Sequence, residues 1–170
     1  MHNHQHIKLL FSVAIAMAGF AVASPAQAQN LVVSIMNAST GQCLAPRHHN
    51  PFEPGDEIVQ QPCNGSTAQQ WTIVSGPFGS SKSLNHLING LSHFCLDARG
   101  GAINGTNIEQ WPCNQISNEN WSFGTADNGN NLLVSRVSGT STHCIVSAFN
   151  GVLQLRACDG SDPNQQWILL

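Results

Sequence analysis

Charge is scarce in this sequence, and helical patterning is absent. Charged residues make up 9% of the 170 residues, with six Lys and Arg against nine Asp and Glu. The few basic residues are scattered, which argues against a nucleic acid or an anionic membrane surface as a partner. No segment repeats its apolar residues at the helical period of about 3.6 with capping residues at its ends. Asn, Gln, Ser and Gly are abundant instead, which predicts an extracellular surface of neutral hydrogen-bonding groups.

The sequence also lacks the patterns expected of a metal site or a hydrolase. No two of the six cysteines are spaced C-x-x-C, and their separations do not resemble a zinc knuckle. No G-x-S-x-G elbow occurs, and cysteines that are all paired would leave no thiol nucleophile. Asp97, Glu109 and Glu119 could supply the two carboxylates of a glycosidase, but nothing else in the sequence supports that role. We therefore expect no metal, no cofactor and no catalysis.

Residues 1–28 are predicted to be a signal peptide. Lys8 precedes an apolar run over residues 9–23, and the small-x-small sequence AQA follows at 26–28. We expect cleavage after this motif, with the earlier AVA as the alternative site. The run is short for a membrane span, which needs about 20 apolar residues, and a retained anchor is the less favoured reading. The expected product is a secreted chain, extracellular or periplasmic, with one domain over residues 29–170 and no membrane insertion.

Three copies of one unit fill this mature chain. When the first cysteine of each copy is aligned, Met36, Ile88 and Val137 coincide, and each precedes a residue typical of turns. Each copy ends in a tryptophan eight or nine residues after its second cysteine. Short β-rich segments separated by Gly, Asn, Ser and Pro give about four strands per copy. The copies span about residues 31–77, 84–124 and 131–170.

Twelve short strands in three equivalent parts predict an all-β fold, a closed barrel of threefold pseudo-symmetry capped by hairpins. Closure would leave no long sheet edge open to aggregation. The repeat tryptophans, Trp71, Trp121 and Trp167, are expected to be buried around the pseudo-axis. Because each copy carries two cysteines, the repeat also selects one disulfide pairing. The predicted pairs are Cys43–Cys63, Cys95–Cys113 and Cys144–Cys158.

Several motifs resemble the ricin B-type lectin family. They are Cys95-Leu96-Asp97, Trp111-Pro112-Cys113 and the Gln-x-Trp endings at Trp71 and Trp167. The resemblance covers essentially all of the mature chain. It implies the β-trefoil fold and the binding of sugars, chiefly galactosides or xylan-like chains. Whether the chain acts alone or beside a separate enzyme or toxin chain stays open.

The resemblance places a sugar site in the middle copy. There it implies five carbohydrate-binding residues, Asp97, Glu109, Trp111, Asn118 and Glu119. The first copy has Ala45 and Gln61 in place of the acid and the aromatic ring. The third has Val146 and Arg156 at the same positions. One copy of three is therefore expected to bind.

The residue types in the middle copy suit a pyranose, which has an apolar face of C–H groups and an edge of hydroxyls. The indole of Trp111 would meet the face, and the Asp97 carboxylate would accept hydrogen bonds from neighbouring hydroxyls. The amide of Asn118 can both donate and accept. Glu109 and Glu119 depart from the family, which usually has glutamine there. We expect Glu119 to lie near Asp97, to raise the apparent pKa of the pair and to weaken sugar binding or make it pH-dependent.

Plainer interpretations stand beside this one. Trp111 could merely cover barrel surface, and Asp97 could cap a turn beside Arg99. The whole chain could be a secreted β-trefoil scaffold or inhibitor that recognises protein, with the proline-containing loop Arg47–Glu57 doing the work.

Overall fold

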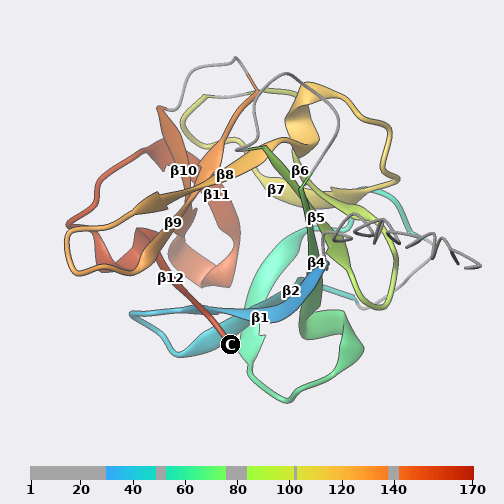
Figure 1. Cartoon of the computed structure of the whole chain (residues 1–170), viewed down its shortest axis with the longest axis horizontal. Coiled ribbons are helices and arrows are strands. Elements are labelled where there is room, and N and C mark those ends of the chain that lie inside the picture. The colour runs from blue at the N-terminus through green and yellow to red at the C-terminus, as the bar shows by residue number, and fades with distance from the viewer. Residues whose placement is uncertain (1–29, 49–52, 76–83, 102, 138–141) are drawn as a thin grey trace, which may run out of the picture.

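The computed structural model describes residues 30–48, 53–75, 84–101, 103–137 and 142–170 (Figure 1). The predicted signal peptide lies outside this part of the chain. The described segments form twelve strands, as predicted, together with four 3-10 turns of three residues each. In these ranges no helix is long and apolar enough to span a bilayer. The 3-10 turns are η1 (Thr67–Gln69), η2 (Ser117–Glu119), η3 (Phe149–Gly151) and η4 (Pro163–Gln165).

Six strands close into a barrel, because each pairs antiparallel with the next and the last returns to the first. The sequence of pairs is β1 to β4, β4 to β5, β5 to β8, β8 to β9, β9 to β12 and β12 to β1. Each repeat contributes two of these strands. Their bounds are β1 (Leu31–Asn37), β4 (Gln70–Ser75), β5 (Asn85–Asn89), β8 (Trp121–Thr125), β9 (Asn131–Ser135) and β12 (Gln166–Leu169).

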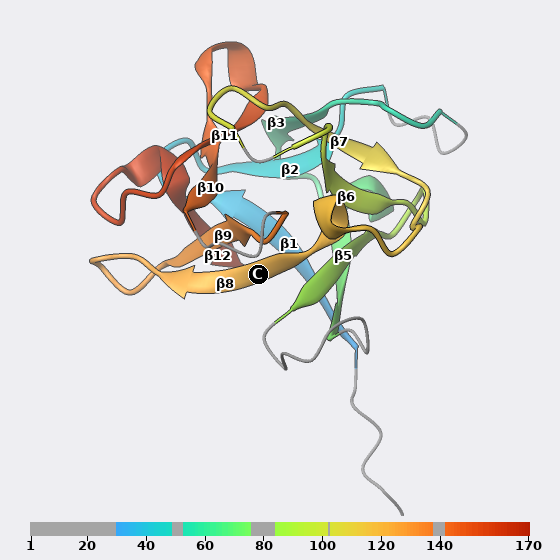
Figure 2. The same ribbon diagram turned by 90° about the horizontal axis from the view of Figure 1, so that it is seen from above.

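The other six strands form three hairpins, one per repeat. Each hairpin is joined to the barrel through its first strand, so β2 pairs with β1, β6 with β5 and β10 with β9. The three hairpins gather on the same side of the barrel (Figure 2). This is the capped, pseudo-threefold arrangement that the repeat predicted. The hairpin strands are β2 (Gln42–Pro46), β3 (Ile58–Pro62), β6 (Cys95–Ala98), β7 (Ile108–Trp111), β10 (His143–Ser147) and β11 (Leu153–Ala157).

The core is built from residues of the barrel strands and of the hairpin strands. In β1, Val33 and Ile35 are buried and Ser34 between them is partly exposed, as the two-residue period of a strand requires. The predicted tryptophans Trp71, Trp121 and Trp167 are fully buried in the same cluster. Each indole Nε1 donates to the backbone carbonyl that follows the first cysteine of its repeat, at 2.9–3.2 Å. The indoles therefore tie each hairpin to the barrel, and burying them costs no unpaired N–H group.

Two of the three predicted turns are closed by an asparagine. The Asn37 side-chain oxygen accepts from the backbone N–H groups of Ser39 and Thr40, at 3.0 and 3.1 Å. Asn89 does the same for the two backbone N–H groups at the matching positions, at 3.0 and 3.2 Å. Asparagine favours such turns because its side chain imitates a backbone acceptor. The third position, Ser138, lies outside the described residues.

The structure contains the three predicted disulfides, one within each repeat. Each joins the first strand of a hairpin to the residue or two that follow its second strand. Chain-entropy arguments assign each loop of this size about 3 kcal/mol of stability. Three disulfides also fit a protein of an oxidising, extracellular compartment.

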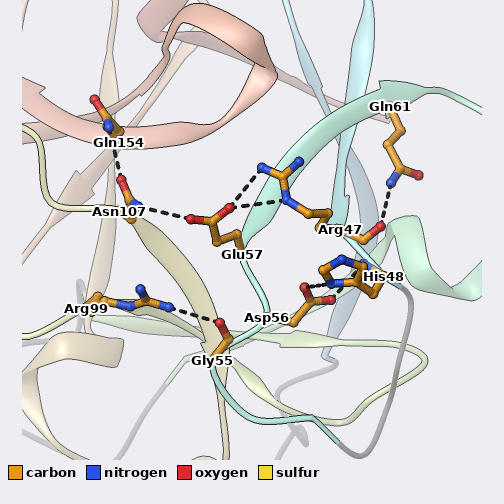
Figure 3. Close-up of polar contacts among 9 residues, drawn as sticks. All are labelled: Arg47, His48, Gly55, Asp56, Glu57, Gln61, Arg99, Asn107 and Gln154. Atoms are coloured by element: carbon orange, nitrogen blue, oxygen red, sulfur yellow. Dashed lines mark hydrogen bonds and ion pairs between the residues drawn. The ribbon is translucent and has the colours of Figure 1, made fainter.

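One chain of polar contacts crosses all three repeats between the hairpins (Figure 3). Arg47 and Glu57 of the first repeat form an ion pair at 2.9 Å. The amide of Asn107, in the middle repeat, donates to the other oxygen of Glu57 at 3.1 Å. Gln154, in the third repeat, donates to the side-chain oxygen of Asn107 at 3.0 Å. This network fixes the first repeat against the start of β7, beside the predicted sugar site.

Candidate functional site

The register of one hairpin brings the main site residues together. In the β6–β7 pair, Asp97 lies opposite Glu109 and Cys95 lies opposite Trp111. Directly opposed residues share a face of an antiparallel pair, and so do residues two apart along a strand. Asp97, Glu109 and Trp111 therefore project from the same face of the hairpin.

These side chains line a pocket of about 240 Å³. Trp111 forms its open wall, because 40% of this residue is exposed, whereas Trp71, Trp121 and Trp167 are fully buried. Asp97 and Glu109 are nearly buried, at 3% and 6% exposure. Asn118 reaches the pocket from η2, the turn that follows the second cysteine of the repeat. The complete lining is Asp97, Gly100, Glu109, Trp111, Ile116 and Asn118.

Asp97 is the buried acid of the pocket. Within the described ranges no backbone or side-chain group donates a hydrogen bond to its carboxylate, so it caps no turn in this part of the chain. Burial and, after it, the like charges of Glu109 and Glu119 together raise its pKa from 3.8 to about 7, against the opposing charge of Arg99. At neutral pH this carboxyl group is therefore poised between its two charge states, and it faces the pocket.

Glu109, in contrast, is already paired. Its carboxylate accepts from the Nε of Arg99, and Arg99 also donates through Nη2 to the carbonyl of Gly55 at 3.0 Å. The guanidinium thus joins the middle repeat to the first repeat's loop (Figure 3). The ion pair holds Glu109 at the pocket wall and leaves Asp97 as the acid that a ligand would have to satisfy.

Glu119 lies beneath the pocket and does not line it. It is fully buried, and its carboxylate accepts from the backbone N–H groups of Asn114 and Gln115 at 3.0–3.2 Å. His86 Nδ1 lies 3.6 Å from one of its oxygens. Glu119 therefore holds the turn that presents Asn118, and it reaches Asp97 only through its charge.

The matching glutamines of the other repeats show what the acid changes. Gln69 accepts from one backbone N–H at 2.8 Å and donates to the Pro62 carbonyl at 2.9 Å. Gln165 makes the same pair of bonds, the second to the Ala157 carbonyl at 3.0 Å. An ionised Glu119 accepts but has no proton to donate. The middle repeat thus keeps the accepted hydrogen bond, lacks the donated one and adds a buried charge.

A loop of the first repeat packs beside the site. Gly55 donates to the Gln110 carbonyl at 2.8 Å, and Gln110 donates to the Asp56 carbonyl at 2.9 Å. This segment therefore runs beside β7, and Glu57 forms an isolated antiparallel bridge with Glu109. A Cβ on Gly55 would lie 3.6 Å from the Trp111 ring and 3.7 Å from a Glu109 oxygen. The first repeat thus adjoins two side chains of the pocket, although all the lining residues belong to the middle repeat.

His86, Cys95 and Glu119 bring three potential metal ligands within 4.8 Å of one another. Cys95 is bonded to Cys113, so its sulfur is not a thiolate. Only two groups of the cluster could then bind an ion, fewer than the three or four protein ligands usual for zinc. The cluster does not fit a metal site while the disulfide is closed.

Sequence reasoning named four of the lining residues and missed two contributions. Asp97, Glu109, Trp111 and Asn118 meet at the pocket, while Glu119 lies behind it. Ile116 forms part of the pocket wall, and no sequence motif indicates this position. The approach of Gly55 depends on contacts between repeats, which spacing within one repeat cannot indicate.

The comparison with known families agrees with this architecture. The sequence model of the ricin-type beta-trefoil lectin domain matches residues 31–167. The chain belongs to the ricin-type β-trefoil lectin family. Lectin domains of this family are typically binding modules without catalytic activity. Among curated proteins, none matches the sequence.

Solved structures share the ricin-type fold at low sequence identity. ThreeFoil, a designed threefold symmetric protein, is 20% identical over 82% of this chain and 97% of that one, with a TM-score of 0.68. The C-half of the earthworm R-type lectin, in complex with GalNAc, is 18% identical over 81% and 96%, with a TM-score of 0.58. An exo-beta-1,3-galactanase from Clostridium thermocellum is 24% identical over 82% of this chain, with a TM-score of 0.70. The match spans only 30% of that galactanase.

Proposed function

We propose that this ricin-type lectin is secreted and binds a galactoside or a xylan-like glycan, mainly through the pocket of its middle repeat and without catalysis. The observation that carries the proposal is that one pocket pairs a partly exposed indole, Trp111, with a buried acid, Asp97, to which no described residue donates. The indole offers a flat apolar face, and the acid accepts hydroxyl protons. Asn118 supplies a group that both donates and accepts.

The other repeats support this assignment by contrast. At the positions of Asp97 and Trp111, the first repeat has Ala45 and Gln61. Val146 and Arg156 stand there in the third. Neither pair offers a carboxylate beside an aromatic ring. A single site gains no avidity within one chain, so we expect modest affinity for one sugar and stronger attachment to a polymer that several copies can reach.

A glycan array probed with the purified protein tests the proposal and reports the sugar. Tryptophan fluorescence then places the site, because Trp111 is partly exposed while the other three tryptophans are fully buried. A bound sugar should change the emission and protect Trp111 from acrylamide quenching. An empty array, together with unchanged quenching in galactoside and xylan titrations, would favour the protein-binding scaffold.

A further inference from the structure

The pocket of the middle repeat carries more negative charge than a neutral sugar requires. Asp97 on β6 and Glu109 on β7 line it, and Glu119 of η2 lies beneath. Arg99, which follows β6, is occupied by Glu109 and by the carbonyl of Gly55. His86 on β5 faces Glu119 and not the pocket wall. A ligand that enters the pocket therefore meets an excess of carboxylate.

The acid that lines the pocket is also buried and lacks a donor among the described residues. Only 3% of Asp97 is exposed. A buried carboxylate without hydrogen-bond donors is costly, and Arg99, the cation that acts on Asp97, is already paired with Glu109. A neutral hydroxyl supplies a hydrogen bond but leaves the charge uncompensated. A protonated amine supplies up to three N–H donors together with the missing positive charge.

We infer that the pocket prefers a hexosamine with a free, protonated amine, whose ring lies on the Trp111 indole and whose ammonium binds the Asp97 carboxylate. The inference rests on the proposed function, because it uses the indole as a sugar platform. An indole also attracts a nearby cation through its ring electrons. The pocket volume of about 240 Å³ suits a single ring better than a longer segment. N-acetylation removes the charge, and a uronic acid adds repulsion.

The preference should depend on pH in a defined direction. The pKa of Asp97 is raised to about 7 by burial and by Glu109 and Glu119, so the acid is mostly protonated at pH 5. An ammonium favours the ionised form, so the advantage of a hexosamine should grow as the pH rises through about 7. It should shrink again where the ligand amine loses its proton. High salt should reduce it, because the pocket is open to solvent.

Titrations with individual sugars, followed by the fluorescence of Trp111, test the inference. Galactosamine and glucosamine are each compared with the N-acetylated form, the neutral hexose and the uronic acid, at low salt and at pH 5 and 7.5. We expect the free amine to bind about tenfold tighter than the neutral hexose at pH 7.5, and the uronic acid to bind most weakly. At pH 5 the advantage should fall to about twofold.

Two variants separate the pocket acid from overall charge. Asp97→Asn should reduce the amine preference to about twofold at both pH values. Asp127→Asn removes an exposed carboxylate between β8 and β9, a change in net charge comparable at pH 7.5 to that of Asp97→Asn, and should keep the full preference. Thermal unfolding of both variants checks that each is folded. Equal binding of amine and neutral sugar by the wild type, or a preference that survives Asp97→Asn, would overturn the inference.

A further arm distinguishes a sugar site from a general ammonium site. Nα-acetyl-lysine amide carries a free side-chain amine without a pyranose ring, and it should fail to compete with the sugars. Competition as strong as that of the hexosamines would refute the hexosamine assignment. If neither neutral nor amino sugars change the fluorescence, the proposed lectin function itself has failed, which is a different result from a sugar site without amine preference.

Discussion

The middle repeat and its two neighbours have the same scaffold and different outward side chains. Each repeat buries one tryptophan against the carbonyl that follows its first cysteine, and each closes one disulfide. On the hairpin face, however, the middle repeat has Asp97, Glu109 and Trp111, whereas the other repeats lack both the acid and the ring. The side chains of each unit that face the core thus maintain the barrel, and those on the pocket side of its hairpin are free to differ.

Removing the ring that distinguishes the middle repeat should have the largest effect. In Trp111→Ala the sugar loses its platform, and we expect affinity to fall at least 30-fold, or about 2 kcal/mol, as for a central tryptophan of a binding site. Isothermal titration calorimetry with the best sugar from the array measures this loss.

Arg156→Ala is the matched control, because Arg156 occupies the position of Trp111 in the third repeat and is exposed. Affinity should stay within about twofold of wild type, since its contact is a bond to Gln154 at 3.2 Å within the same strand. Equal losses in both variants would mean that binding is shared between repeats.

Asp97→Asn should separate stability from binding. The pKa of Asp97 rises from 3.8 in the unfolded chain to about 7 in the folded protein, so the folded state holds a proton that the unfolded chain releases. Its favourable contribution is complete below pH 3.8 and is lost as the pH rises through about 7. At pH 8 the folded protein holds Asp97 as a buried charge, which costs stability. Asparagine carries no charge, so the variant should bind sugar poorly but unfold less easily at pH 8.

Urea unfolding at pH 8 and pH 4 measures the effect. Each pKa unit corresponds to about 1.4 kcal/mol of stability. Water that reaches the pocket screens the charge and reduces the effect, so we expect a gain on the order of 2 kcal/mol at pH 8. The gain should nearly vanish at pH 4. A variant less stable than wild type at pH 8 would show that Asp97 has a stabilising partner in the folded protein.

Glu119→Gln makes the middle repeat resemble its neighbours beneath the pocket. The new amide can donate to the Pro112 carbonyl, as Gln69 does to Pro62, and a negative charge near Asp97 disappears. The pKa of Asp97 should fall, so the pH at which sugar affinity is half-maximal should move to lower values. Affinity measured between pH 5 and 8 in both proteins tests this shift. Superimposable curves would mean that Glu119 does not influence the pocket.

The fold and most of the site were predictable because both depend on sequence patterns within single repeats. The Cys and Trp spacings determine the strands, the disulfides and the buried indoles, since each is a local feature that occurs three times. Asp97 and Trp111 stand out because their sister positions differ. The buried position of Glu119 and the approach of Gly55 to the pocket residues were not predictable. They depend on how hairpins of different repeats pack, which no spacing along the chain encodes.

Gly55→Ala should produce the smallest effect and tests whether the first repeat contributes to the pocket. Gly55 has φ of +83°, and the added methyl would approach Trp111 and Glu109. Gly129 has a similar φ of +88° in open space, so Gly129→Ala has the same backbone cost, about 1 kcal/mol, without a neighbour. Both variants should lose similar stability in urea unfolding. Only Gly55→Ala should alter sugar affinity, by about threefold, because its strained backbone adjoins the ring and the paired acid. Equal affinities would confine the site to the middle repeat and leave the loop as support for β7 alone.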